Sequence, residues 1–287
     1  MTTTAGPDSK HTFGESRFVT LDDGRRLHFR IRGNGGPTVV FESGMGLSGS
    51  IWGLVQPAIA ERTTTVVYDR ACSGKSDDDD APRDLERTVA DLVQLLRAVP
   101  GPFILVGSSW GGPIVRSVAM TGEFDIKGLV LVDQSDENAA EYFTPAGEKR
   151  MAQTGSFAVF FARTGLYRLM ARMGRSQPKD VYADFRKDFG IRGARMMGAE
   201  AREFLPSMRR LRDNPARLEG IDVTVISGTK VSFVDKSQRP AINVAHRRTA
   251  EFLDKGRFVD ASNSGHYVMF TEPEIIVDET LRLLPDA

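Results

Sequence analysis

One serine lies in a pattern suited to nucleophilic chemistry. Ser109 is flanked by Gly107 and Gly111, in the spacing G-x-S-x-G, between an apolar run at 102–106 and an apolar helical pattern at 113–120. A serine in a sharp turn between a strand and a helix needs neighbours without side chains, because strand and helix approach closely there. The helix behind it turns its positive N-terminal end toward a developing negative charge. The pattern predicts that Ser109 is a nucleophile.

A nucleophilic serine needs a base, and one histidine is well placed for that role. His266 follows the last predicted strand, at 257–260, in a loop from which its side chain can reach the sheet edge that carries the serine. The spacings H-E-x-x-H and C-x-x-C are absent, so we expect no metal site. The other histidines are interpreted as surface or packing residues: His11 in the N-terminal tail, His28 in a hairpin and His246 on a helix.

A second glycine pattern offers a different reading. Gly44, Gly46 and Gly49 follow a predicted strand in the spacing of the dinucleotide-binding fingerprint, and Asp69 lies about twenty residues beyond. The fingerprint normally sits on the first strand of its sheet, whereas a hairpin comes first here. The same loop could instead present the backbone N–H of Met45 to the substrate of the serine. We therefore expect no cofactor, and keep an NAD(P)-binding oxidoreductase and a non-catalytic ligand-binding protein as alternatives.

Strands and helices alternate along most of the chain. A hairpin is predicted at 17–20 and 25–32, and helical patterns separate the later apolar runs. Alternation of this kind predicts an α/β fold with a mostly parallel, twisted sheet and helices on both faces. The predicted buried strands are 38–42, 63–68, 102–106, 126–133 and 222–228.

Residues 136–219 interrupt this alternation. They contain no convincing strand, and apolar residues such as Phe157, Phe161 and Met170 recur at helical intervals. The segment predicts either a helical layer packed on the sheet or a cap whose apolar side chains, these three among them, bind the substrate. The predicted organisation is a disordered tail at 1–13, a core domain at 14–135 and 220–287, and a helical cap or lid insert at 136–219.

The composition excludes several classes of partner. The 287 residues carry 38 basic and 38 acidic side chains, so the zero net charge gives no reason to expect a nucleic-acid or membrane partner. Cys72 is the only cysteine, which excludes an internal disulfide and is typical of a reducing compartment. With no apolar leader at the start, we expect a cytoplasmic protein acting on a small molecule, with the oligomeric state open.

The chain resembles an α/β-hydrolase, in the branch of bacterial single-domain esterase-like serine hydrolases, from residue 17 to residue 284. Ser43 stands where the oxyanion loop of that family usually has histidine, and Cys72 replaces a common glycine. The order serine, acid, histidine is that of the family. The segments that carry the resemblance are Val40–Gly46, Tyr68–Ala71, Leu105–Gly111, Gly128–Asp133 and Ser264–His266.

The resemblance implies a Ser-His-Asp hydrolase that works through an acyl-enzyme. His266 would take the proton of Ser109, and the N–H groups of Met45 and Trp110 would form the oxyanion hole. The implied function is cleavage of an ester-type acyl bond, as in a carboxylesterase or lactonase, in a largely apolar small molecule. A thioesterase or amidase would use the same triad.

The acid of the triad has two candidates. Asp133 ends the strand that follows the serine helix, at the carboxyl edge where such sheets place their sites. Asp235 lies in the loop after the strand at 222–228, near the position the family commonly uses, but could reach His266 only if that loop doubled back. We favour Asp133 and keep Asp235 as the alternative.

Overall fold

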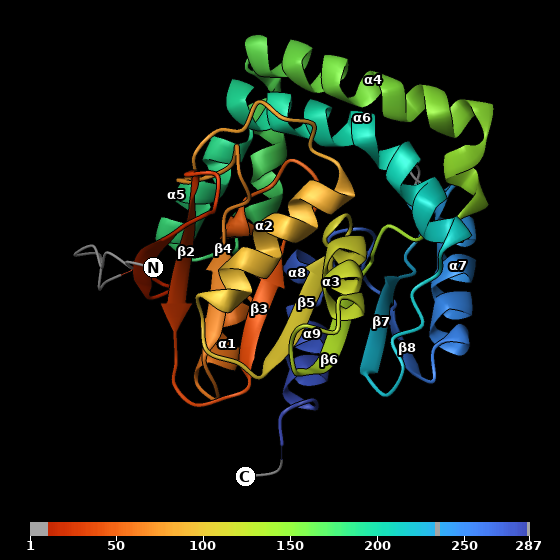
Figure 1. Cartoon of the computed structure of the whole chain (residues 1–287). Coiled ribbons are helices and arrows are strands. Elements are labelled where there is room, and N and C mark those ends of the chain that lie inside the picture. Colours follow the sequence, from red (N-terminus) through yellow and green to blue (C-terminus); the bar gives the residue numbers. More distant parts are fainter. Residues whose placement is uncertain (1–10, 233–235, 286–287) are drawn as a thin grey trace.

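The computed structural model of this chain describes residues 11–232 and 236–285. Its centre is one eight-stranded sheet with the strand order β1-β2-β4-β3-β5-β6-β7-β8 (Figure 1). The strands are β1 (Glu15–Thr20), β2 (Arg26–Arg32), β3 (Thr38–Glu42), β4 (Thr65–Tyr68), β5 (Phe103–Ser108), β6 (Ile126–Val132), β7 (Asp222–Gly228) and β8 (Lys255–Ala261).

The pairing of the strands confirms the predicted fold class. β1 and β2 form an antiparallel hairpin, β2 also pairs antiparallel with β4, and β4 and the strands beyond it run parallel. Every residue of β3, β4 and β5 is buried, because helices cover both faces of the parallel part of the sheet.

The sheet divides the apolar core into two layers, one on each face, and helices cover both layers. One layer holds α2 (Leu85–Arg97), α3 (Gly111–Met120) and α7 (Arg239–Phe252). The other holds α1 (Gln56–Ala60), α8 (Val268–Thr271), α9 (Pro273–Leu281) and the short 3-10 helix η1 (Gly49–Trp52). Among the described residues, no helix is both long and apolar enough to cross a membrane.

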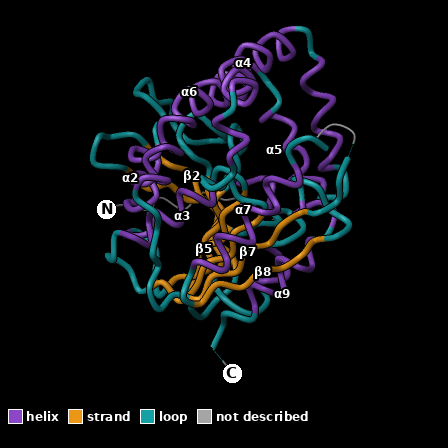
Figure 2. Tube along the Cα trace, turned by 90° about the vertical axis from the view of Figure 1, so that its right-hand side faces the viewer, coloured by secondary structure: helices purple, strands orange, loops and turns teal. Residues whose placement is uncertain are grey.

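Residues 136–219 form helices and loops above one end of the sheet. Long helix α4 (Pro145–Arg163) lies along α6 (Ile191–Asp213), and the two remain side by side in both views (Figure 1, Figure 2). Where they cross, a Cβ on Gly155 would lie only 2.5 Å from the Cα of Gly198, so the contact requires glycine. The elements are η2 (Ala140–Phe143), α4 (Pro145–Arg163), η3 (Leu166–Gly174), α5 (Lys179–Asp188) and α6 (Ile191–Asp213). We call this layer the cap.

The predicted N-terminal tail at 1–13 is wrong for its last three residues. The backbone N–H of Thr12 donates to the carboxylate of Asp180 on α5 at 2.6 Å, and its hydroxyl donates to the same carboxylate at 2.8 Å. Phe13 is 3% exposed and belongs to the core layer of α1 and α9. The sequence carries no local signal for this contact, because a cap helix 168 residues away along the chain supplies the partner. Residues 1–10 lie outside the described part.

Candidate active site

Ser109 occupies the sharp turn that its glycine neighbours predict. It follows β5 directly, precedes α3, and has a backbone φ of +51°, a strained value for a residue with a side chain. A Cβ at Gly107 would lie 2.5 Å from the carbonyl oxygen of Gly111, and one at Gly111 would lie 2.6 Å from that of Glu42. Both glycines are therefore required for strand and helix to meet at this turn.

Asp133 and His266 are brought together from two separate strand ends. The Nδ1 of His266 lies 2.7 Å from Oδ2 of Asp133, which follows β6 with a φ of +41°. The carboxylate is buried, whereas the His266 side chain is 41% exposed. The Gly228 N–H also donates to Asp133 at 3.0 Å, and Nη1 of Arg239 donates to its two oxygens at 2.7 and 2.9 Å. Asp235 lies outside the described residues.

These partners keep Asp133 ionised. Burial raises the pKa of Asp133, but the hydrogen bond and charge of His266, with the charges of His246 and Arg239, bring it below its ordinary value. His246 is fully buried, with Nε2 2.8 Å from the carbonyl oxygen of Gln134. A charged carboxylate on Nδ1 of His266 orients the ring and leaves its Nε2 for proton transfer.

One cavity joins the serine, the histidine and the glycine-rich loop. Its volume is about 150 Å³, and its walls include Ser109, His266 and Met45. A neighbouring cavity of about 470 Å³ shares Tyr167, Met170 and Met197 with it. Among the predicted substrate-binding residues, Met170 lines both cavities, and Phe157 and Phe161 line the second.

The predicted oxyanion donors flank the serine. A Cβ on Gly44 would lie 3.2 Å from Cβ of Ser109, so the loop after β3 passes directly over the turn. Trp110 is buried at the start of α3, with its ring packed on Phe204. Among the described residues, the N–H groups of Met45 and Trp110 have no hydrogen-bond acceptor, so both can serve an incoming oxyanion.

A buried ion network fixes the conformation of this loop. Arg70 donates to the carbonyl oxygens of Ser43 at 2.6 Å and Gly44 at 2.8 Å. Its guanidinium also contacts Glu42 and, through Nε and Nη2, both carboxylate oxygens of Glu200, at 2.9 and 3.0 Å. Glu200 belongs to cap helix α6 and is fully buried. Burial opposes the charge of Arg70, but the two carboxylates raise its pKa above the ordinary value.

Two cap carboxylates accept backbone N–H groups of the loop. Glu200 accepts the Gly46 N–H at 2.8 Å, and Asp188 on α5 accepts the Ser48 N–H at 3.0 Å. Burial raises the pKa of Asp188 to about 7. Sequence reasoning missed both acids, because nothing local distinguishes them from the other acids of the same helices, such as Asp184 and Glu203, which are partly exposed.

Glu200→Gln is expected to lower kcat and to destabilise the fold by about 3 kcal/mol, because it leaves a buried guanidinium with one carboxylate and removes a charged acceptor from the oxyanion loop. Urea unfolding and ester hydrolysis measure the two effects. Glu203→Gln, on the same helix and partly exposed, is the control and should change neither. A destabilised Glu200→Gln protein that keeps its kcat would contradict the link between Glu200 and the oxyanion loop.

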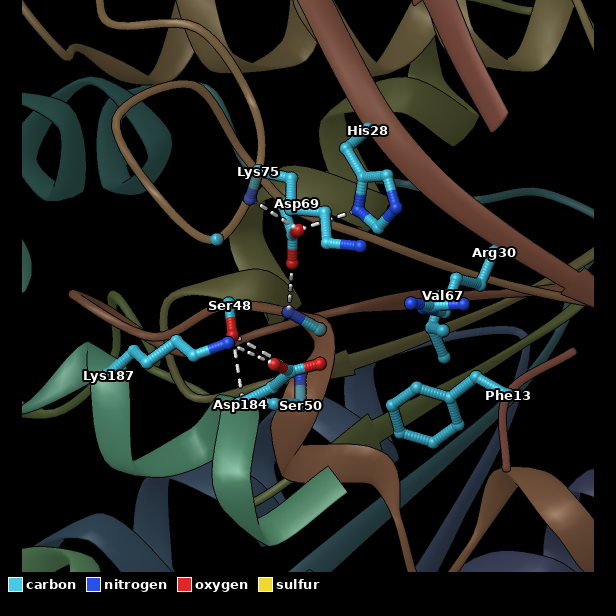
Figure 3. A pocket seen from close by; sticks show the side chains of 12 residues that line it. Phe13, His28, Arg30, Ser48, Ser50, Val67, Asp69, Lys75, Asp184 and Lys187 are labelled. Carbon is cyan, nitrogen blue, oxygen red and sulfur yellow. Dashed lines mark hydrogen bonds and ion pairs between the residues drawn. The ribbon is translucent and has the colours of Figure 1, made fainter. Parts of the chain in front are cut away.

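Asp69, the acid that would accompany a dinucleotide-binding loop, is hydrogen-bonded to other parts of the protein. Its carboxylate lies 2.8 Å from Nδ1 of His28 and accepts the N–H groups of Gly49 at 3.2 Å and Lys75 at 3.0 Å (Figure 3). His28 in turn lies 2.8 Å from the hydroxyl of Ser16. These bonds tie the hairpin to two loops beside a cavity of about 90 Å³, so Asp69 has a structural role. Among the described residues, no cluster of His, Cys, Asp or Glu could hold a metal ion.

Comparison with known proteins identifies the family. A model of the alpha/beta hydrolase family matches residues 39–279, so the chain belongs to that family and to the general class of hydrolases. The uncharacterized protein YqjL of Bacillus subtilis is 25% identical over 257 residues, which cover 88% of this chain and 86% of YqjL.

Two solved structures share the fold. An esterase from Exiguobacterium antarcticum superposes with a TM-score of 0.71 at 17% identity, over 92% of this chain and 97% of the esterase. The haloalkane dehalogenase DatA from Agrobacterium tumefaciens gives 0.74 at 14% identity, over 97% of this chain and 100% of DatA. Because these proteins differ in chemistry, the likeness shows the fold, and the reaction must be argued from the site.

Proposed function

We propose that this protein is a serine hydrolase that cleaves an ester-type acyl bond, as a carboxylesterase or lactonase does, in a largely apolar small molecule. The observation that carries the proposal is the hydrogen bond of 2.7 Å between His266 and the buried carboxylate of Asp133, at a cavity that also holds the strained Ser109. A nucleophile and a base at one cavity, with a buried acid hydrogen-bonded to the base, are the parts that acyl transfer needs.

The reaction follows from these positions. Nε2 of His266 takes the proton of the Ser109 hydroxyl as the oxygen attacks the acyl carbon, and the N–H groups of Met45 and Trp110 receive the oxyanion. The bond to the leaving oxygen then breaks, and His266 returns the proton to that oxygen. Water, deprotonated by His266, attacks the acyl-enzyme, which releases the acid and restores Ser109. Asp133 stabilises the imidazolium formed in both steps.

The lining of the two cavities supports an apolar acyl group. Leu47, Ile51, Phe189 and Met269 contribute to the cavity of the serine, and none of the described residues that line it is Asp, Glu, Lys or Arg. Beyond Met170, the neighbouring cavity adds the rings of Phe157 and Phe161, and Lys149 and Arg150 are also part of its lining. An acyl chain that extends from Ser109 into the neighbouring cavity would bury its methylene groups against these residues.

Hydrolysis of p-nitrophenyl esters tests this proposal. From acetyl to octanoyl, kcat/KM is expected to rise about threefold to fourfold for each methylene that is buried. Phe161→Ser should remove much of the gain for octanoyl and leave acetyl unchanged, whereas Phe252→Ser, an exposed control on α7, should alter neither. A kcat/KM that falls with chain length would contradict the apolar pocket, and faster cleavage of the matching p-nitroanilides or thioesters would reassign the protein as an amidase or thioesterase.

A further inference from the structure

The cap carries a long segment of one charge, although the chain as a whole is neutral. Residues 149–179 contain seven Lys or Arg side chains and no Asp or Glu. Four of these arginines show no ion pair among the described residues, and all four are exposed: Arg163, Arg168, Arg172 and Arg175. The zero net charge therefore hides a strongly cationic stretch on α4 and η3, which pack against each other.

Large apolar side chains are exposed along the same stretch. Their exposed fractions run from 41% to 59%, where a folded chain would normally bury such side chains. The rings of Phe160 and Phe161 pack edge to face, 5.5 Å apart, without covering each other. We call this set the cap rim: Phe157, Phe160, Phe161, Leu166, Leu169 and Met170.

The cap rim adjoins the route to the serine. Phe157, Phe161 and Met170 line the cavity that shares a wall with the active-site cavity. Helix α4 lies at the outer edge of the molecule, on the far side of α6 from the sheet (Figure 1, Figure 2). A flat partner could therefore approach the cap rim without meeting the core domain.

We propose that the cap rim and its arginines dock on an anionic lipid surface. Bulky apolar side chains that enter the boundary between headgroups and acyl chains, beside arginines that meet lipid phosphates, are the chemistry of interfacial binding. A second copy of this chain fits poorly, because pairing two such surfaces would place four exposed arginines against four. The proposal revises the expectation of no membrane partner, which rested on net charge alone.

The docked orientation brings the mouth of the apolar cavity to the surface where apolar esters accumulate. Lipid binding itself needs no hydrolysis, so it is measured with Ser109→Ala protein. Failure of this proposal is thereby distinguishable from failure of the proposed function.

Sedimentation with lipid vesicles is the test. The protein is expected to bind vesicles that mix phosphatidylglycerol with phosphatidylcholine and to bind vesicles of pure phosphatidylcholine only weakly. High salt should release it from the anionic vesicles. Arg168→Gln/Arg172→Gln should weaken the partition about thirtyfold, from about 1 kcal/mol for each charge. Phe160→Ser/Leu169→Ser should weaken it about tenfold or more.

Matched controls lie away from the cap. Arg62→Gln/Arg248→Gln removes two exposed charges near α1 and on α7, and Val244→Ser/Phe252→Ser removes two exposed apolar side chains on α7. Both should bind vesicles like the parent protein. In the background with Ser109 intact, all four double variants should keep the parent melting temperature and hydrolyse p-nitrophenyl acetate normally.

Four outcomes would overturn the proposal. The first is no binding to anionic vesicles at low salt, and the second is equal binding to neutral vesicles. The third is self-association in sedimentation velocity that the Phe160→Ser/Leu169→Ser variant abolishes, which would assign the cap rim to a second copy. The fourth is binding to polyglutamate as tight as binding to the anionic vesicles and unchanged in the Phe160→Ser/Leu169→Ser variant. That result would assign the arginines to an acidic protein partner.

Discussion

Ser109→Ala is expected to lower kcat/KM for ester hydrolysis by roughly 10⁴ to 10⁶, because the members of a catalytic triad act as a unit. Without the hydroxyl no acyl-enzyme can form, and only binding and the oxyanion donors remain. The side chain sits in a turn that glycines make possible, so alanine fits the same backbone and the fold should persist. The measurement is steady-state hydrolysis together with covalent labelling by a fluorophosphonate probe.

The probe should label the protein once and leave Ser109→Ala unlabelled. Ser108→Ala, at the last residue of β5, is the neighbouring control and should still be labelled, with activity within about tenfold of the parent. Labelling of Ser109→Ala at the parent rate would refute the assignment of the nucleophile. Tight NADH binding that depended on Gly44 would favour the oxidoreductase instead.

Asp133→Asn is expected to reduce kcat by roughly 10⁴. The amide oxygen can keep the bonds from Gly228 and Arg239, which turns the amide N–H₂ toward His266. Nδ1 must then accept, and the ring carries its proton on Nε2, where it cannot take the proton of Ser109. The measurement is kcat, with circular dichroism and a melting temperature to show that the variant is folded.

Two control substitutions sharpen this prediction. Asp136→Asn removes another buried carboxylate of the same turn, which bonds Thr249 and Asn138 without contacting His266, and should change kcat by less than about tenfold. Asp235→Asn tests the alternative acid. If Asp235→Asn loses activity while Asp133→Asn keeps it within tenfold, the acid is Asp235, and the hydrogen bond to Asp133 is structural.

The sheet could be predicted from the sequence because its strands are short apolar runs that need no partner to be recognised. β3, at Thr38–Glu42, matches the predicted range, β6 ends one residue before its predicted end, and β5 is shifted by one to two residues from the predicted 102–106. Ser109 and His266 could be placed for a related reason, since the turn glycines and the loop after the last strand are local features. Asp133 followed from the rule that carboxyl ends of parallel strands meet at one edge.

The tertiary contacts could not be predicted from the sequence, because the residues that form them lie far apart along the chain. Glu200 reads as one more acid on a charged helix, yet it lies 130 residues from Arg70 and reaches the loop over the serine. Phe13 looked like part of a polar tail because the core layer that buries it is made of residues far along the chain, among them residues of α1, α5 and α9. In both cases, long-range packing overrode the local pattern.

The carboxylates of Glu200 and Asp188 also bear on how substrate enters. A cap that swung away as a lid would draw both from their partners, and breaking one buried pair alone costs about 3 kcal/mol. An open state at that energy is populated less than about once in a hundred molecules. Substrate and product are therefore expected to exchange without cap opening, past Met170, Tyr167 and Met197, which line both cavities.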